Sequence, residues 1–315
     1  MLASTLLRLL GAATLAKVSF KAVSWLSFWL LPELPLTKYR RSPQPWAMIT
    51  GASAGIGLGF AEALAARNFN IVLLGHKQDE LEEAKIGIVG KFPRIGVRIF
   101  VLDAISASPA EIQSTLESLS HLNMTILVNN VGGLSVPPSK YYRRVNDTTA
   151  EEMDRVISLN ARFMAHLTRL AIPILARNGP SLILNVGSAS MLGMPGVATY
   201  SACKSFVMAF TKAVGREMRA DGIQVDVLAL VLGEVYTQAN AGKLPPGTPT
   251  AKDFAEAAVS HMGRAVSWGR LCFHPWMWHA LQDAMVDFLP ESVRNYVLAS
   301  VFHQKRKEQT GLKSE

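Results

Sequence analysis

Tyr200 and Lys204 have the residue types and the spacing of a catalytic acid and its activator. On a helix, residues four positions apart share one face. A tyrosine hydroxyl titrates near 10, so its use as an acid near neutral pH requires the phenolate to be stabilised by roughly 3 pKa units, or about 4 kcal/mol. A neighbouring ammonium provides such stabilisation through its charge. The alternative is that both are ordinary residues of a helix, and the rest of the sequence decides between these interpretations.

A glycine-rich stretch, Thr50-Gly-Ala-Ser-Ala-Gly-Ile-Gly, follows an apolar run and precedes a helical pattern that begins near Leu58. Gly51, Gly55 and Gly57 permit a tight turn and let backbone N–H groups approach a pyrophosphate at the positive end of a helix. Their spacing differs from the usual G-x-G-x-x-G fingerprint. Glycine-rich turns also occur without ligands, but at the first strand of an alternating α/β chain the pattern favours a bound nucleotide.

Short apolar runs alternate with longer segments of helical period from Trp46 onward, which predicts an α/β fold. The alternation implies a doubly wound, Rossmann-type parallel sheet with helices on both faces. Such sheets bind ligands beyond the carboxyl ends of their strands. The predicted strands cover residues 47–50, 71–74, 99–102, 126–128, 182–186 and 225–230. The glycine-rich stretch and Ser188 both follow strands, as this rule requires.

The end of the second strand indicates which nicotinamide cofactor the fold prefers. Folds that prefer NAD place an acid there to bind the adenosine ribose, whereas basic groups accommodate the 2′-phosphate of NADP. Here the strand ends Leu74-Gly-His76-Lys77, and the first acid is Asp79. We therefore expect NADP(H), with His76 and Lys77 near the extra phosphate. The alternative for Lys77 is a solvated residue at the start of a helix.

The composition suits one globular unit with appendages. The chain has 315 residues, 49% of them hydrophobic, which is enough to bury one large core. The net charge is +8, and the basic residues are scattered or lie near the ends, which suits an anionic membrane surface better than a nucleic acid. Cys203 and Cys272 have no metal-ligand spacing. We therefore predict no metal site, no nucleic-acid partner and a reducing compartment.

Residues 1–37 are predicted to be a membrane anchor segment, because residues 2–31 are mostly apolar and carry no acid. A bilayer core needs about 20 apolar residues, and each mid-bilayer lysine costs roughly 2.5 to 3.5 kcal/mol. Lys17 and Lys21 therefore leave two interpretations open, a spanning helix and a helix that lies in the interface with its lysines on one face. A cleaved signal peptide is the third, although no small-residue cleavage pattern follows the aromatic end.

Residues 38–240 are predicted to form the catalytic domain, and residues 241–315 a helical lid that extends it toward substrate and membrane. Apolar stripes in the extension predict two helices, within 254–261 and 276–289. Such stripes usually belong to a core, but beside an apolar amino terminus they also suit a surface that holds an acyl chain or faces a membrane. Residues 307–315 are expected to be a solvated tail.

Several motifs, in order along the chain, make it resemble the short-chain dehydrogenase/reductase family over about residues 46 to 240. The glycine-rich stretch matches the family's cofactor loop, Asp103 its adenine contact and Asn129-Asn-Val-Gly its fourth-strand motif. The residues that match its catalytic tetrad are Asn160, Ser188, Tyr200 and Lys204. The cofactor-binding residues that the resemblance implies are Gly51, Ser53, Gly55, Ile56, Gly57, His76, Lys77, Asp103, Asn129, Tyr200, Lys204, Val235 and Thr237.

The resemblance also implies a role for each member of the tetrad. A nicotinamide supplies only the hydride for the reduction of a ketone, so the proton comes from the protein, and Tyr200 would donate it. Lys204 would favour the phenolate and bond the nicotinamide ribose, Ser188 would polarise the carbonyl, and Asn160 would hold a water that resupplies the proton. Ser190 rivals Ser188 by sequence alone, and the family spacing favours the latter.

The chain departs from the family pattern after the sixth predicted strand. The family usually has Pro-Gly-x-Val-x-Thr where this loop meets the nicotinamide carboxamide, and this chain has Leu232-Gly-Glu-Val-Tyr-Thr237. The loop therefore lacks the stiffness of a proline, and Glu234 adds a charge near the cofactor. The departure bears on substrate fit and turnover more than on the type of reaction.

Within the family the chain is similar to the membrane-bound branch of very-long-chain 3-oxoacyl-CoA reductases and their 17-beta-hydroxysteroid dehydrogenase relatives. The cues are the apolar amino terminus, Asn129-Asn-Val-Gly, Tyr200-Ser-Ala-x-Lys-x-Phe-Val and Trp276-Met-Trp-His-Ala-Leu. The resemblance implies an NADPH-dependent oxidoreductase that converts a 3-oxoacyl-CoA to a 3-hydroxyacyl-CoA in very-long-chain fatty-acid elongation. It would lie on the endoplasmic reticulum membrane, facing the cytosol, as a homodimer or with other enzymes of the pathway. The alternatives are a dehydrogenase of steroids or other lipophilic alcohols, and a non-catalytic membrane scaffold.

Overall fold

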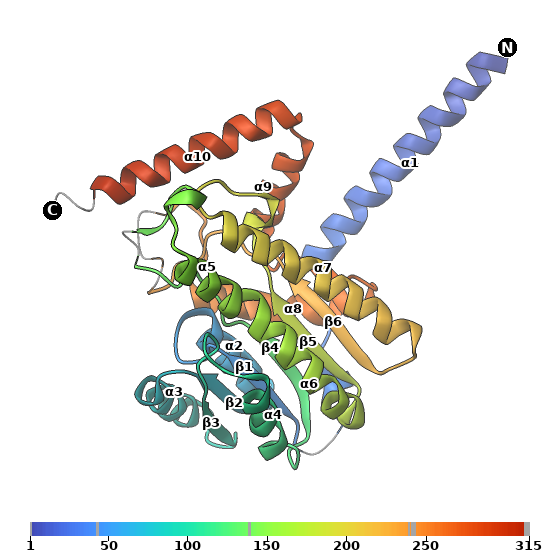
Figure 1. The fold of residues 1–315 in the computed structure, drawn as a ribbon. Coiled ribbons are helices and arrows are strands. Elements are labelled where there is room, and N and C mark those ends of the chain that lie inside the picture. The colour runs from blue at the N-terminus through green and yellow to red at the C-terminus, as the bar shows by residue number, and fades with distance from the viewer. Residues whose placement is uncertain (1, 42–43, 138–139, 239, 241–243, 312–315) are drawn as a thin grey trace.

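The computed structural model describes residues 2–41, 44–137, 140–238, 240 and 244–311. A seven-stranded parallel sheet with the order β3-β2-β1-β4-β5-β6-β7 lies at the centre (Figure 1). The strands are β1 (Trp46–Thr50), β2 (Asn70–Gly75), β3 (Val97–Val101), β4 (Met124–Asn129), β5 (Ser181–Val186), β6 (Val225–Leu230) and β7 (Cys272–Phe273). The chain runs outward from β1 on one side and from β4 on the other, so the predicted doubly wound sheet is confirmed. The order reverses between β1 and β4, which is where such sheets bind nucleotides.

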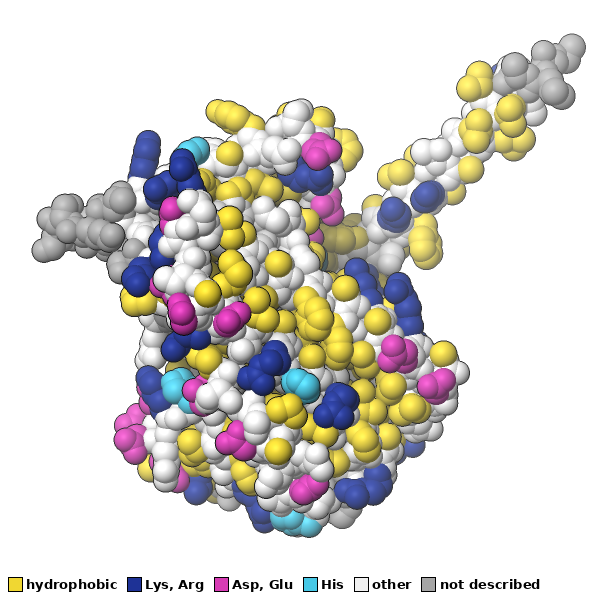
Figure 2. Space-filling model, viewed as in Figure 1, with side chains coloured by type: hydrophobic (Ala, Val, Ile, Leu, Met, Phe, Trp, Pro, Cys, Tyr) yellow, Lys and Arg dark blue, Asp and Glu magenta, His cyan; other side chains and the backbone are white. Residues whose placement is uncertain are grey.

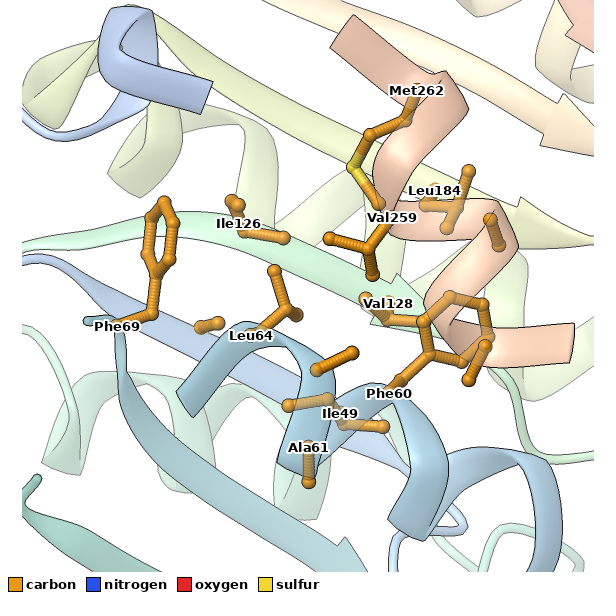
Figure 3. Packing of buried hydrophobic residues seen from close by; sticks show 14 of the residues in the cluster. Ile49, Phe60, Ala61, Leu64, Phe69, Ile126, Val128, Leu184, Val259 and Met262 are labelled. Carbon is orange, nitrogen blue, oxygen red and sulfur yellow. The ribbon is translucent and has the colours of Figure 1, made fainter. Parts of the chain in front are cut away.

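Helices cover both faces of the sheet, which explains why its strands are continuously apolar. Along β1, Ala47 and Ile49 belong to one core and Met48 to the other. The first core lies beneath α2 (Gly55–Ala66), α3 (Gln78–Lys91) and α8 (Ala251–Ser267), and the second beneath α4 (Pro109–Ser118), α6 (Phe163–Asn178) and α7 (Ala198–Ala220). Figure 3 shows the first core, where Phe60 and Val259 reach from α2 and α8 toward the strands.

Helix α1 (Leu2–Leu30) projects from the body of the molecule, and hydrophobic side chains lie along it (Figures 1 and 2). Its exposed side chains include Leu6, Leu15 and Val23. Residues at these positions point in different directions around a helix, so the apolar surface is not confined to one face. In the described part of the chain, no helix is long and apolar enough to cross a membrane.

The last turn of α1 and the residues after it are fixed to the catalytic domain. Arg264 of α8 is only 2% exposed, and its guanidinium donates hydrogen bonds to the carbonyl oxygens of Phe28, Leu31 and Pro32. The end of a helix leaves its last carbonyl groups without partners inside the helix. Arg264 therefore supplies the donors that hold this end of α1 against α8.

The C-terminal residues contain more structure than the sequence predicts. The two expected helices are α8 and α9 (Met277–Phe288), but β7 also extends the sheet, and a further helix, α10 (Glu291–Gly311), follows α9. The expected solvated tail is therefore helical up to Gly311, and the remainder lies outside the described residues. Contacts from α9 and α10 reach the loops after β5 and β6, so the extension covers the edge of the sheet where ligands bind.

Candidate active site

The glycine-rich stretch after β1 has the backbone that only glycine adopts readily. Gly51 and Gly55 have φ angles of 63° and 56°, in the left-handed region. At Gly57 a Cβ would collide with the carbonyl group of Gly51, so the helix start and the loop before it are in direct contact. Asn130, which sequence reasoning left without a role, holds the loop by donating to the carbonyl oxygen of Thr50 at 2.9 Å. These residues form a cradle of the kind that a pyrophosphate fills.

The end of β2 brings together two of the predicted cofactor-binding residues with a carboxylate that the sequence does not indicate. Lys77 Nζ lies 2.6 Å from Glu80 Oε1, and Ser53 Oγ donates to Glu80 Oε2 at 3.1 Å. The hydrogen bond from Lys77, followed by the one from Ser53, holds the pKa of Glu80 below its usual value. Lys77 and Glu80 are both exposed, and such pairs contribute about 0 to 1 kcal/mol. Lys77 can therefore exchange its partner for a phosphate at little cost.

Asp103 and Asn129 each have protein partners in addition to their predicted cofactor roles. Asp103 Oδ1 accepts from the Ile105 backbone at 2.9 Å, which shapes the turn after β3. Asn129 is buried, and its Nδ2 donates to Asn185 at 2.8 Å and to Thr168 at 3.0 Å. Its Oδ1 accepts no hydrogen bond from the described residues. Asn129 therefore ties β4 to β5 and α6, and only its oxygen remains available to a ligand.

Asn160 and Lys204 both lie close to Gly132. A π-helical turn, Ser158–Arg162, joins α5 (Ala150–Ile157) to α6 and turns Asn160 inward. Asn160 exchanges two hydrogen bonds with the Gly133 backbone, at 2.7 and 3.0 Å. A Cβ at Gly132 would lie 2.8 Å from Asn160 Oδ1 and 3.2 Å from Lys204 Nζ. The two predicted members of the proton path thus face the same small space, which a side chain at 132 would fill.

Tyr200, Ser188 and Lys204 form the centre of the site. Lys204 Nζ lies 5.5 Å from the centroid of the Tyr200 ring and donates to the Val186 carbonyl oxygen at 2.9 Å. Burial raises the pKa of Tyr200 to about 12, against the opposing effect of a hydrogen bond with Ser188. Burial also lowers the pKa of Lys204 to about 8. The free site therefore lacks the phenolate stabilisation that the sequence predicts, because burial outweighs the hydrogen bond with Ser188, and the phenol is protonated at neutral pH.

Ser188 and Ser190 differ in their position relative to Tyr200. Ser188 bonds Tyr200, whereas Ser190 donates to Ser188 at 3.0 Å and so lies one bond further from the phenol. Ser201, which sequence reasoning did not single out, fixes this turn by donating to the Ser190 carbonyl oxygen and accepting from the Met194 backbone at 2.9 Å. Ser188 is thus the hydroxyl nearer to Tyr200, with Ser190 behind it.

The loop after β6 connects the two halves of the site. Thr237 lies against the glycine-rich stretch, since a Cβ at Gly55 would be 3.6 Å from Thr237 Cγ2. Val235 is buried in the core. Glu234 lies near enough to Tyr200 to raise the pKa of the phenol, and its own Oε1 is 3.2 Å from Lys305 Nζ of α10. The loop therefore approaches both the cradle and Tyr200.

A shallow cavity, open to solvent, lies beside Tyr200. Its apolar lining includes Leu134, Val136, Val145, Met153, Val156 and Val197. Two cations line it as well, and both bind Glu152: Lys140 at 3.1 Å and Arg143 at 2.8 Å. The hydrogen bond from Arg143, the largest of several, lowers the pKa of Glu152 to about 2. The cavity can accept an apolar chain at the catalytic tyrosine and a polar group near its cations.

A family profile described as short chain dehydrogenase matches residues 45–245. The chain belongs to the short-chain dehydrogenase family. It is 29% identical to a very-long-chain 3-oxoacyl-CoA reductase of Pyricularia oryzae over 277 residues, which is 86% of this chain and 81% of the relative. A reductase of the same name from Scheffersomyces stipitis is 30% identical over 75% of this chain and 68% of its own length. The predicted branch of the family is thereby confirmed.

The fold matches solved members of this family. A short-chain dehydrogenase from Sphingobium yanoikuyae in complex with NADPH superposes with a TM-score of 0.62, at 23% identity, over 78% of this chain and 97% of the other. The described residues hold no group of three or more His, Cys, Asp or Glu side chains arranged for a metal ion.

Proposed function

We propose that this protein is an NADPH-dependent oxidoreductase that reduces 3-oxoacyl-CoA to 3-hydroxyacyl-CoA in very-long-chain fatty-acid elongation. The observation that carries the proposal is the placement of a protonated phenol, Tyr200, against Ser188 and Lys204 at an apolar cavity. The names of the curated relatives support the choice of ketone.

NADP(H) fits the residues that the structure provides. The cradle formed by Gly51, Gly55 and Gly57 suits its pyrophosphate, and Ser53 with Lys77 suits the 2′-phosphate. When bound, NADPH would supply a hydride to the carbonyl carbon. The remaining chemistry belongs to residues of this chain.

The proton for the carbonyl oxygen comes from Tyr200. Because burial keeps its pKa at about 12, the phenol is protonated before the reaction, and the phenolate that remains afterwards needs a nearby positive charge. Lys204 provides that charge, and Ser188 orients the phenol and hydrogen-bonds the substrate oxygen. Asn160, which shares a glycine contact with Lys204, holds the position from which a water returns the proton.

The polar and apolar parts of the cavity suit an acyl-CoA. The thioester and the start of the acyl chain would occupy the apolar lining beside Tyr200, and Lys140 and Arg143 would face the phosphate-bearing portion. Both cations are already oriented by Glu152. A steroid would use the apolar lining and leave the cations without a role.

Assay of the purified protein with NADPH against 3-oxoacyl-CoA substrates and steroid ketones tests this choice. We expect kcat/KM for the acyl-CoA substrates to exceed that for any steroid ketone by at least about 10², which corresponds to roughly 2.7 kcal/mol of transition-state discrimination. Turnover of steroid ketones without any turnover of acyl-CoA would instead establish the steroid alternative.

We further propose that the protein works at a membrane, that of the endoplasmic reticulum with the catalytic domain toward the cytosol. Support comes from α1 and from exposed apolar side chains on α9, namely Met277, Trp278, Leu281, Met285 and Phe288, the last of which is 90% exposed. The full chain should float with phosphatidylcholine–phosphatidylserine vesicles, and Phe288→Glu combined with Met285→Glu should reduce that binding. A wild-type protein that stays out of the vesicle fraction would refute membrane docking.

We also propose a homodimer through α7 and the helices around Asn160. Phe206 of α7 is 42% exposed and stacks on Phe210 at 5.5 Å between ring centroids, which leaves an aromatic face on this helix. Sedimentation should give a dimer for the wild type and a monomer for Phe206→Asp. Other enzymes of the elongation pathway are further candidate partners.

A scaffold without catalysis is the remaining alternative, and Tyr200→Phe separates it from the enzyme. The variant keeps the ring and its packing and loses only the hydroxyl. It should fail to rescue cells that lack the native protein, whereas full rescue would show that the biological role does not depend on the reaction.

A further inference from the structure

His279, in the C-terminal extension, holds the loop that comprises residues 232–237. Its first contact is with Gly233, 46 positions earlier in the chain. His279 lies on α9, is only 4% exposed and packs its ring 5.9 Å from that of Phe254. The loop itself lies between the glycine-rich cradle and Tyr200, as the contacts of Thr237 and Glu234 place it. Its position therefore affects both the cofactor site and the reacting phenol.

Both nitrogens of the His279 ring bind the backbone of this loop. The Gly233 N–H donates to Nδ1 at 3.2 Å, and Nε2 lies 3.0 Å from the Glu234 carbonyl oxygen. An N–H can only donate and a carbonyl oxygen can only accept, so Nδ1 carries no proton and Nε2 carries one. The ring must therefore be neutral, in the Nε2–H tautomer, because an imidazolium would lose the bond from Gly233.

The loop sequence is fitted to this ring. A Cβ at Gly233 would lie 2.7 Å from His279 Cδ2, closer than non-bonded carbon atoms approach, so only glycine leaves room for the ring. A second tie comes from α10, where Lys305 binds the Glu234 side chain at 3.2 Å. Position 232, where the family usually has a proline that would restrict the backbone, is leucine in this chain. The extension thus contacts the loop at Gly233 and Glu234, directly after position 232, where this chain has leucine instead of the family's proline.

We propose that His279 is a positioning residue for the reaction, which clamps the loop Leu232–Thr237 against the cofactor site and replaces the stiffness that a proline at 232 would give. The ring acts through the loop and touches neither cofactor nor substrate. The inference rests on the proposed function in taking NADPH as the ligand that the loop meets. It does not depend on which ketone is reduced.

Two substitutions at this position test the proposal through NADPH binding alone, measured by fluorescence titration without any ketone. His279→Leu removes both hydrogen bonds and should weaken NADPH binding by at least about tenfold, or about 1.4 kcal/mol. His279→Gln offers one acceptor and one donor on a side chain of similar length, and should bind NADPH within about threefold of the wild type. His261→Leu is the matched control, because His261 is a partly buried histidine of α8 whose ring packs on Phe28 and Trp29 of α1. It should leave NADPH binding unchanged.

A spectroscopic measurement covers the case in which His279→Leu does not fold. The ¹⁵N spectra of the imidazole rings are compared between the wild type and His279→Gln at pH 7. The signals present only in the wild type belong to His279, and they should show an unprotonated Nδ1 and a protonated Nε2. The proposal is overturned by wild-type NADPH binding in a folded His279→Leu, by a His279→Gln as weak as the leucine variant, or by a ring protonated at Nδ1. None of these measurements involves turnover of a ketone. A wrong assignment of the substrate would therefore leave their results unchanged, whereas a wrong assignment of the role of His279 would change them.

Discussion

Gly57→Ala tests how closely the structure fits the cofactor cradle. The added Cβ would lie 2.8 Å from the Gly51 carbonyl carbon and 2.7 Å from Asn130 Nδ2, and closer still to the Gly51 carbonyl oxygen. Carbon atoms in contact prefer about 3.5 to 4.0 Å, so the loop has to move by roughly 1 Å. Neither neighbour can give way easily, because one is backbone and the other is bonded to Thr50.

A misplacement of about 1 Å can cost an enzyme about 10² in rate, and we expect a loss of similar size in binding when the cradle itself moves. We therefore expect Gly57→Ala to weaken NADPH binding about 10²-fold, or by about 2.7 kcal/mol. Fluorescence titration of NADPH measures this effect, and circular dichroism checks that the variant is folded. Affinity for NADPH within threefold of the wild type would refute the assignment of this loop to the cofactor.

The matched control is Gly87→Ala, the same change at an exposed glycine of α3. A Cβ there would meet no atom within 4 Å. NADPH binding should remain as in the wild type, and the free energy of unfolding should rise by about 0.5 to 1 kcal/mol, because alanine is favoured over glycine in a helix.

Three further predictions concern charged side chains, two of them near Tyr200 and one at the end of α1. Burial lowers the pKa of Lys204 to about 8, so the reduction rate should fall as the ammonium is lost with pH rising through about 8; a flat kcat profile between pH 7 and 9 would contradict this. Lys305→Ala leaves the carboxylate of Glu234 with its neutral donor Asn240 but without its cation, so the phenol's pKa should rise and kcat should fall a few-fold in steady-state assays; an unchanged kcat would contradict the coupling. Arg264→Met removes the donors at the end of α1 and should lower the free energy of unfolding in urea by about 3 kcal/mol, whereas a change below about 0.5 kcal/mol would contradict this role.

The central strands were predictable because each carries a local signal. Both faces of the central strands are buried, so these strands are mostly apolar runs that stand out between amphipathic helices. β7 has only two residues, Cys272 and Phe273, and forms because β6 offers a free edge, which no local pattern encodes. Likewise α10 lacks a strong apolar stripe, and it was missed because its contacts, such as Lys305 with Glu234, depend on tertiary structure.

The residues of the site also divide into those that the sequence predicts and those that depend on contacts between distant segments. Tyr200, Lys204 and the three glycines stand out because their chemistry depends on type and spacing within one helix or one turn. The hydrogen bond of Ser188 to Tyr200 needed the family spacing to be expected, since Ser190 has the same hydroxyl. The contacts of Asn130, Glu80 and His279 join different segments of the chain, and no spacing rule indicates them.

The most direct test of the central claim is a balanced assay of the purified full chain with NADPH and a long-chain 3-oxoacyl-CoA. Loss of NADPH absorbance and formation of 3-hydroxyacyl-CoA, identified by mass spectrometry, should match one to one. Tyr200→Phe should reduce the rate about 10² to 10⁴-fold, the range for loss of a general acid. An absence of 3-hydroxyacyl-CoA at every chain length, or undiminished turnover in Tyr200→Phe, would contradict the account.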